Sequence, residues 1–262
     1  MEKIENKTNK TSLLIIVLAL ALLHMTFPRA WAETFVESSI SYRITAGFSV
    51  DENAVQKWLP PPWKAISLPK GPLKGANALI FFDDKVIHQY SDGKLFKDGS
   101  FCTSVLLALG KNQETDEVIF FVARVFWPYD DPGPYKNAIK ATVNREATIK
   151  GANLKSATSS EVWTVINNDG GMLEFKLNYQ RTVPIQIKSE IKARSNIDTN
   201  FYRIYRDDSV IDLVMSQPDG INRVKHFELK TTIPELRSIF DGSEKLIGIS
   251  VIPALVRQVF LP

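Results

Sequence analysis

The sequence has 262 residues, of which 23% are charged, and its formal net charge is +3. This length fits one domain with a substantial core, and the near-neutral charge gives no reason to expect a nucleic-acid partner. Cys102 is the only cysteine, which excludes an intramolecular disulfide.

Residues 1–32 match a secretory signal peptide. Lysines open the segment, an apolar run follows from Leu13 to Leu23, and Ala30 and Ala32 are the small residues that a signal peptidase reads. The run falls short of the roughly 20 residues that span a bilayer. We therefore expect cleavage after Ala32, export to the periplasm or the medium, and no stable membrane span afterwards. A retained N-terminal anchor is the alternative. Residues 33–262 are predicted to form a single domain.

Strand-like runs dominate the remaining chain. They are rich in β-branched and aromatic residues, and turn signals such as Asn168–Gly171, Asp207–Asp208 and Asp219–Gly220 separate them, as in antiparallel hairpins. The predicted strands are Ser39–Phe48, Ala78–Phe82, Phe101–Leu109, Val118–Phe126, Ser160–Ile166, Met172–Tyr179, Phe201–Arg206, Ser209–Met215 and Arg223–Leu229.

Four segments are predicted to be helical. Asp51 can cap the first, and the prolines from Pro60 to Pro62 cannot continue it. These elements together predict an α+β fold that is mostly antiparallel β, with a curved sheet or barrel-like core and peripheral helices. The predicted helices are Asp51–Leu59, Pro134–Arg145, Ile233–Phe240 and Lys245–Phe260.

Common catalytic motifs are absent: the chain has no phosphate loop, no HExxH and no GxSxG. His88, His226 and Cys102 lack the spacing of a metal site, so neither a metal nor a cofactor is expected. Asp83 and Asp84 would point to opposite faces of a strand, which disfavours joint acid–base work. We interpret this pair as a solvated strand end.

Three blocks, in this order, resemble the acetoacetate decarboxylase-like family. The first is FSVDENAVQKWLPPPW, a strand that leads into a capped helix and a proline turn. The second has a Tyr-Asp-Asp turn followed by an Asn-Arg-Glu sequence. The third is the C-terminal segment, which contains one Ile-Pro motif and one Val-Ile-Pro motif. The resemblance implies the family's fold, an internal cavity and a homo-oligomer. The blocks are Phe48–Trp63, Phe121–Gly151 and His226–Pro262.

Decarboxylases of this family use a lysine in an apolar pocket, which forms a Schiff base with a β-keto acid. The resemblance implies that role for Lys150, with Glu146 positioning polar groups and Arg43 holding a carboxylate. Lys150 has no second lysine beside it, unlike the family motif, and Lys155 is an alternative nucleophile. Three functions therefore stay open: an exported lyase acting on a small keto acid, a non-catalytic protein that binds a small or lipid-like molecule, and an assembly protein of the envelope.

Overall fold

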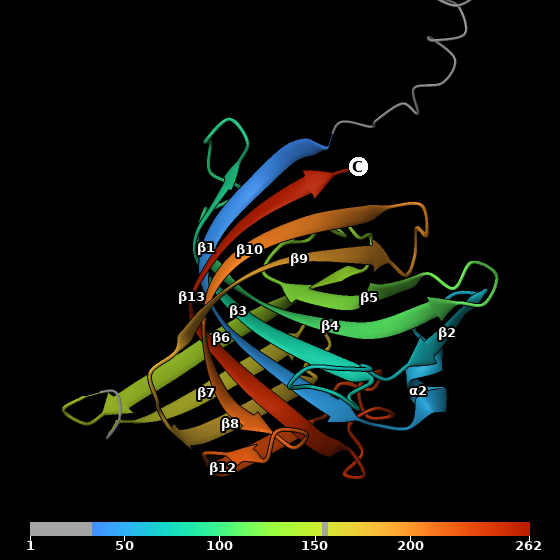
Figure 1. The fold of residues 1–262 in the computed structure, drawn as a ribbon. Coiled ribbons are helices and arrows are strands. Elements are labelled where there is room, and N and C mark those ends of the chain that lie inside the picture. Colours follow the sequence, from blue (N-terminus) through green and yellow to red (C-terminus); the bar gives the residue numbers. More distant parts are fainter. Residues whose placement is uncertain (1–32, 154–156) are drawn as a thin grey trace, which may run out of the picture. The chain divides into compact units, whose positions relative to one another are not determined.

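The computed structural model describes residues 33–153 and 157–262. The predicted signal peptide and Lys155 lie outside these residues. The unit Thr34–Leu261 consists almost entirely of strands (Figure 1). Among the described residues of this unit, α2 (Glu52–Gln56) is the one helix. The strands of the first half are β1 (Thr34–Ser49), β2 (Trp63–Ile66), β3 (Ala78–Tyr90), β4 (Phe101–Asn112), β5 (Val118–Trp127) and β6 (Ala138–Lys150). Those of the second half are β7 (Thr158–Asn167), β8 (Met172–Gln180), β9 (Ile185–Ser195), β10 (Tyr202–Ser216), β11 (Ile221–Asn222), β12 (Val224–Thr231) and β13 (Lys245–Leu261).

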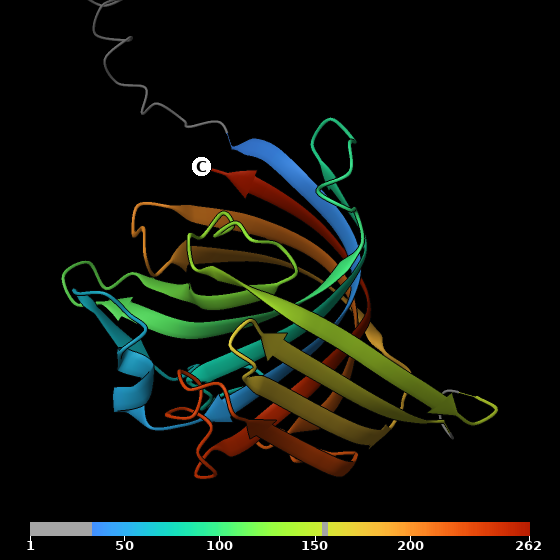
Figure 2. The ribbon, with the colours of Figure 1, turned by 180° about the vertical axis from the view of Figure 1, so that it is seen from behind.

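Seven strands pair in a closed circuit, which we call the ring. The circuit runs β5–β9–β10–β13–β1–β3–β4 and returns to β5, because β5 pairs antiparallel with β4 and parallel with β9. A further stretch of β5 pairs parallel with β6, from which the antiparallel strands β6, β7, β8 and β12 continue. We call these four strands the outer sheet. Figures 1 and 2 show the outer sheet lying beside the ring strands as a second layer.

Each predicted strand corresponds to an observed strand, but several boundaries differ. The strand β3 continues beyond Phe82 to Tyr90, β1 begins at Thr34 and not at Ser39, and the two strands predicted over Phe201–Arg206 and Ser209–Met215 are the single strand β10. The turn predicted at Asp207–Asp208 is wrong, because both residues lie inside the continuous strand β10. There β10 is paired on both sides, with β9 and with β13, so its backbone groups are satisfied without a turn. The hairpin at Asn168–Gly171 is confirmed, since it joins β7 to β8 with Ile166 opposite Met172.

Only the first predicted helix is found among the described residues. Asp51 caps α2 as expected, its side chain accepting a hydrogen bond from the Ala54 backbone N–H at 2.9 Å. The helices predicted over Pro134–Arg145 and Lys245–Phe260 are wrong, because those segments form β6 and β13. Ile233–Phe240 folds into consecutive turns. The peripheral helices of the predicted fold are therefore not present in the described chain, apart from α2.

The strand β13 owes its apolar pattern to burial on both faces. It lies between β1 and β10, and every residue from Ile247 to Ile252 is buried. A strand buried on both faces loses the polar alternation that marks a surface strand, and its apolar residues then also satisfy helical spacing. The pattern in the sequence is real, but it reflects the central position of the strand.

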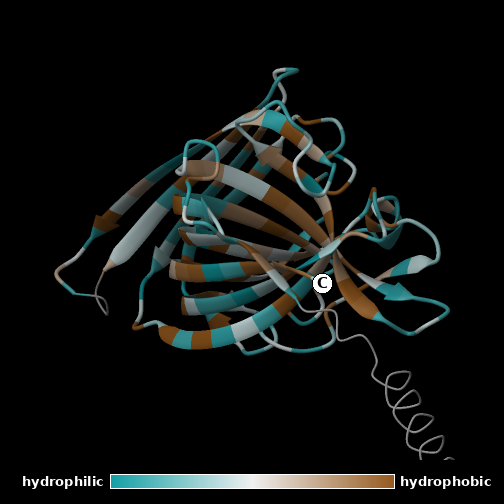
Figure 3. Ribbon diagram, turned by 90° about the horizontal axis from the view of Figure 1, so that it is seen from above, coloured by the Kyte–Doolittle hydropathy of each residue, from teal (hydrophilic) through white to brown (hydrophobic). Residues whose placement is uncertain are grey.

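Alternate residues of the ring strands have different surroundings, as the banded hydropathy in Figure 3 indicates. On one face, Phe82 of β3 packs against Trp163 and Phe175 of the outer sheet, with ring centroids 5.5 and 4.8 Å apart. All three are fully buried and belong to the main core. The opposite face of the same strands looks into the ring. Within the described residues, no helix is long and apolar enough to cross a membrane.

Candidate functional site

The ring encloses a cavity of about 410 Å³. This size lies within the range of about 300–1,000 Å³ that is common for pockets that bind small molecules. Side chains at alternate positions of the seven ring strands form its wall, and the loop between β2 and β3 adds Leu68 and Leu73. The outer sheet contributes no residue to this wall.

Charged side chains gather in one part of the cavity. Along β1 and β3, the register pairs Ser39 with His88 and Arg43 with Asp83. Antiparallel pairs of this kind place their side chains next to each other on one face. The strand pairing therefore brings together charged residues that lie about forty or more positions apart in the sequence.

Asp83 holds two cations at the centre of this charged part. Its carboxylate accepts hydrogen bonds from Arg43 at 3.1 and 3.2 Å, and the Lys85 ammonium lies 3.1 Å from Oδ2. Asp83 is 2% exposed. Burial alone raises the pKa of this carboxyl group, but Arg43 and Lys85 outweigh that effect and hold the pKa well below its usual range. Asp83 is therefore a permanent anion at physiological pH.

Lys85 is a partly buried lysine with cationic neighbours. Its side chain is 14% exposed, and its ammonium lies 5.9 Å from the centroid of the Phe101 ring. Burial lowers the pKa of Lys85, Asp83 opposes that shift, and the positive charges of Arg43 and Arg257 add to it, so that the net shift is downward. This is the direction that makes a lysine nucleophilic.

Glu37 forms a second charged group beside the first. It accepts two hydrogen bonds from Arg203, at 2.8 and 2.9 Å, and its Oε2 lies 3.1 Å from His88 Nε2. Burial alone raises the pKa of Glu37, yet His88 and Arg203 bring it down to about 2. Burial also lowers the pKa of His88, despite the hydrogen bond with Glu37, so the neutral ring with its proton on Nε2 fits this contact.

The charges in the wall leave an excess of one positive charge. Arg257 pairs with Asp207 through hydrogen bonds of 2.6 and 2.7 Å. Besides the exposed Lys70 and the neutral His88, the wall then carries four cations and three carboxylates. A low-dielectric cavity with one unbalanced cation favours a monoanionic ligand. The four cations are Arg43, Lys85, Arg203 and Arg257, and the three carboxylates are Glu37, Asp83 and Asp207.

Two polar atoms of the wall residues have no hydrogen-bond partner among the described residues. They are His88 Nδ1 and Arg203 Nε, and both are buried. Buried polar groups are normally paired, because an unpaired one costs free energy. Both atoms therefore carry an unfavourable free energy in this structure.

The predicted site residues do not come together. Arg43 lies in the cavity wall, where its side chain is 6% exposed. Lys150 and Glu146 lie on β6 in the outer sheet, where both are exposed and neither lines the cavity. An exposed amine lacks the burial that the predicted Schiff-base role requires.

Arg145, next to Glu146, has a different function. Its guanidinium lies between the ring and the outer sheet, 2.9 Å from Asp84 and 3.0 Å from Glu161, and 3.5 Å from the centroid of the Tyr42 ring. Tyr42 donates a hydrogen bond to Glu161 at 2.8 Å. We call Arg145, Asp84, Glu161 and Tyr42 the interlayer cluster. Its members satisfy one another, which indicates a structural role.

Asp83 and Asp84 point to opposite faces of β3, as their adjacency predicts. The interpretation as a solvated strand end is wrong, because one carboxylate is buried in the cavity and the other joins the interlayer cluster. Lys85 is not among the site residues predicted from the sequence. A signal was present, since Asp83 and Lys85 are two residues apart on a strand and must share a face.

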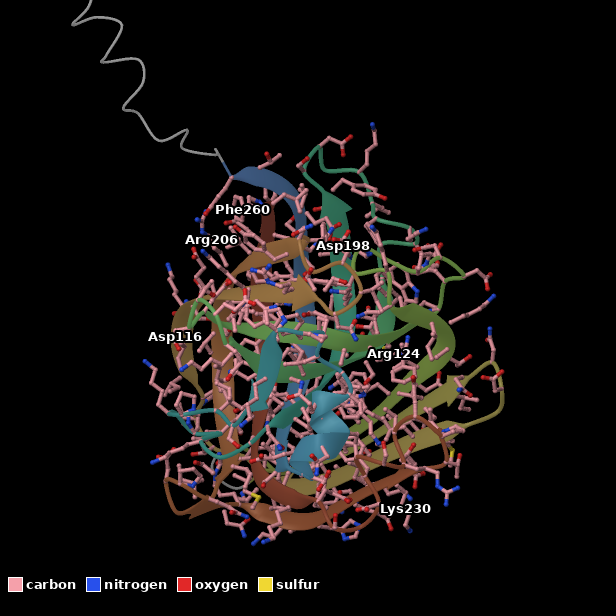
Figure 4. All side chains as sticks on the ribbon, turned by 90° about the vertical axis from the view of Figure 1, so that its right-hand side faces the viewer. Asp116, Arg124, Asp198, Arg206, Lys230 and Phe260 are labelled. Atoms are coloured by element: carbon pink, nitrogen blue, oxygen red, sulfur yellow. The ribbon has the colours of Figure 1, made fainter. Side chains whose placement is uncertain are left out.

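A second hollow, of about 310 Å³, lies between α2 and β5. Lys57 and Arg124 are its cations, and Arg124, labelled in Figure 4, lies 2.6 Å from Glu235. Both side chains are about one-third exposed, so this ion pair belongs to the surface.

Comparisons with known proteins reveal likeness at the level of structure. No family model matches the sequence, and no curated protein matches it. An acetoacetate decarboxylase-like enzyme from Sphingomonas wittichii RW1 superposes with a TM-score of 0.55 at 10% identity, over 91% of this chain and 96% of that one. The enduracididine biosynthesis enzyme MppR gives 0.53 at 9% identity over 86% and 85% of the two chains. MppR complexed with pyruvate gives 0.52 at 10% identity over 89% and 90%. The protein has an acetoacetate decarboxylase-like fold, as its three sequence blocks predict.

Proposed function

We propose that the protein is a Schiff-base enzyme that acts on a keto acid inside the ring, with Lys85 as the reactive amine. The observation that carries the proposal is the position of Lys85. It lies in the cavity wall with its side chain 14% exposed, its ammonium lies 3.1 Å from Asp83, and Arg43 and Arg257 act on it as further positive charges.

A lysine must be neutral to attack a carbonyl carbon, so its pKa has to fall. Desolvation and neighbouring cations both disfavour the ammonium, and Lys85 experiences both. Asp83 stays ionised and would serve as the counter-ion of the protonated imine. The proposal thus gives Lys85 the role that the sequence motif suggested for Lys150.

The chemistry balances without a cofactor. The neutral Lys85 amine adds to the ketone carbon, a proton is taken up from solvent and water leaves, which gives a protonated imine. In a β-keto acid, the bond to the carboxylate then breaks, carbon dioxide departs, and the electron pair moves to the imine nitrogen as an enamine forms. The enamine takes a proton on carbon, and water hydrolyses the new imine to release the ketone and the lysine.

Keto acids are the ligand class that the fold and the charges favour. The likeness to an acetoacetate decarboxylase-like enzyme supports a β-keto acid, and the MppR complex with pyruvate supports an α-keto acid. The wall has a surplus positive charge when Lys85 is protonated, and the protonated imine restores that charge after Lys85 has reacted, so both states favour a single carboxylate. The sequence of residues 1–32 supports export, so we propose that the reaction takes place in the periplasm or outside the cell, in a protein that associates with copies of itself.

Reductive trapping tests the proposal. The protein is incubated with acetoacetate or with pyruvate, treated with borohydride, and its intact mass is measured. We expect the mass of one reduced adduct in the wild type and in Lys150→Met, and no adduct in Lys85→Met. An adduct that persists in Lys85→Met would overturn the assignment. No adduct with either acid in the wild type would overturn the enzymatic function for these substrates.

Non-catalytic binding is the second candidate function, and the Asp83–Lys85 pair favours it. A carboxylate 3.1 Å from the ammonium opposes loss of the lysine proton. A protein of this kind would bind an acid in the cavity and leave it unchanged. Calorimetric binding of a keto acid without any adduct after borohydride would support this candidate over the enzyme.

A further inference from the structure

We infer that the ligand of the ring cavity is a carboxylic acid with an extended apolar chain, and that Leu73 sets the length of chain that fits. The inference rests on the proposed function only in that it places a carboxylate in the same cavity. It adds the chemical nature of the rest of the ligand and a residue that determines specificity.

The cavity wall changes from charged to apolar along the strands. On β1 and β3, the paired positions run from Arg43 and Asp83 to Thr45 and Phe81, and then to Gly47 and Leu79. On β4, the partner of Leu79 is Leu107. A short keto acid would occupy the charged part and leave these apolar side chains uncovered. A ligand with an apolar chain would cover both parts.

The loop between β2 and β3 forms part of the wall at the apolar end of the cavity. Leu73 of this loop lies against Gly47 and Gly248, which face each other across β1 and β13. A Cβ atom on Gly248 would lie 2.7 Å from Leu73 Cδ2, and one on Gly47 would lie 3.3 Å from it. Two side-chain-free positions on adjacent strands therefore provide the space that the Leu73 side chain occupies.

Backbone and side-chain hydrogen bonds hold this loop in place. The Leu68 N–H donates to the Ala76 carbonyl at 2.8 Å, and the Gly75 N–H donates to the Leu68 carbonyl at 2.9 Å. From β10, the Ser216 hydroxyl lies 2.8 Å from the Pro72 carbonyl oxygen and 2.9 Å from Asp219 Oδ2, and these two acceptors share its one proton. A loop tied at both its base and its tip keeps Leu73 at a fixed position, so the wall can limit the length of a bound chain.

The carboxylate is placed at the charged end because the apolar end offers only one cation. That cation is Lys70, which is exposed and therefore well solvated. The ammonium of Lys85 is largely removed from water and gains more from an anionic partner. Replacing each lysine separately distinguishes the two orientations.

Calorimetry with saturated straight-chain acids from butyrate to laurate tests the inference. In the wild type, we expect Kd to fall about fourfold for each added methylene, because each buried methylene contributes about 0.8 kcal/mol, until a limiting length is reached. Leu73→Ala should move that limit to longer acids, with about fourfold tighter binding of the first acid beyond the wild-type limit. Leu73→Phe should move it to shorter acids.

The matched control is Leu95→Ala, since Leu95 is 53% exposed and lies outside the cavity wall. It should keep the wild-type limit. Lys85→Met should weaken the binding of every acid at least tenfold, whereas Lys70→Met should change it less than twofold. A Kd that does not vary with chain length, or a limit that neither Leu73 variant moves, would overturn the inference. So would a larger loss of binding in Lys70→Met than in Lys85→Met.

Saturated acids contain no ketone, so this experiment is independent of Schiff-base formation. If the limit moves with Leu73 while no keto acid gives an adduct, the enzymatic function falls and the inference stands. If an adduct forms on Lys85 but chain length has no effect, the inference falls and the enzymatic function stands.

Discussion

The two faces of strands β1 and β3 form two very different regions. The face toward the outer sheet is a continuous core in which Phe82, Trp163 and Phe175 are fully buried, and its charged residues satisfy one another in the interlayer cluster. The face inside the ring carries a cavity whose charged side chains leave one positive charge unbalanced. Because side chains alternate along these strands, those on one face contribute to the stability of the core and those on the other face line the binding cavity.

The same leucine truncation should cost more in the core between the layers than in the cavity wall. Leu173 of β8 is fully buried, whereas Leu107 of β4 is 4% exposed and lines the cavity. Leu173→Ala removes contacts on all sides and should lower the free energy of unfolding by about 4–5 kcal/mol. Leu107→Ala should cost about 2–3 kcal/mol, because part of its surface already faces the cavity. Denaturant unfolding measures both values, and equal losses would contradict the contrast between the two regions.

Removal of Arg145 should have the next largest effect. Glu161 is 2% exposed, and Arg145→Met would leave its carboxylate buried with only Tyr42 as a partner. We expect a loss of about 3 kcal/mol in the free energy of unfolding, with little change in ligand affinity. The variant that also carries Glu161→Gln should recover part of the loss. A tenfold fall in ligand affinity in the folded Arg145→Met variant would show that this cluster belongs to the binding site.

The fall in the free energy of unfolding at acid pH should depend on Glu37 in the cavity wall. Its pKa is lowered from 4.5 to about 2, so the folded state binds its proton less readily than the unfolded state does. The resulting stabilisation is complete above about pH 4.5 and is lost as the pH falls toward 2, a change of about 2–3 kcal/mol. Denaturant unfolding between pH 5 and pH 2 measures this slope. Glu37→Gln should flatten it, and an unchanged slope in that variant would contradict the assignment.

The smallest expected effect concerns a residue outside both faces. Asp51→Ala removes the side-chain acceptor for the Ala54 N–H and should cost about 1 kcal/mol. Thermal unfolding of Asp51→Ala and Asp51→Asn separates the loss of the cap from the loss of charge. Asn can accept the same hydrogen bond and should retain most of the stability. An equal loss in both variants would attribute the effect to charge.

Of the thirteen strands in the described residues, the sequence predicts eight, misses β2, β9 and β11, and assigns β6 and β13 to helices. It predicts little of how the strands pair. Hydrophobic alternation and turn residues are enough to predict β7 and β8, because these strands form a hairpin of residues that are close in sequence. For β6, the segment from Pro134 to Arg145 follows a turn-rich stretch and is compatible with a helix. Its ten pairs with β7, from Ala141–Asn167 to Lys150–Thr158, make it a strand, and these contacts are not encoded in local spacing. The central strand β13 was misassigned for the related reason that both its faces are buried.

The site was predictable only in part, for a similar reason. The family resemblance implies Arg43, which lies outside the three blocks, and the structure places it in the cavity wall. Lys150 was selected by its position in a motif, but the side of the fold on which that strand lies depends on the pairing of β6 with β7. Lys85 carries no motif at all. Its environment arises from β1, β3, β4 and β13, which meet only in the folded chain.

The central claim is that Lys85 is the amine that reacts with ligands in the cavity inside the ring. The most direct measurement is peptide mass mapping of the wild-type protein after incubation with acetoacetate and reduction with borohydride. The account predicts one modified peptide, with the added mass on Lys85 and none on Lys150. Modification of Lys150, or of exposed lysines without preference, would contradict it.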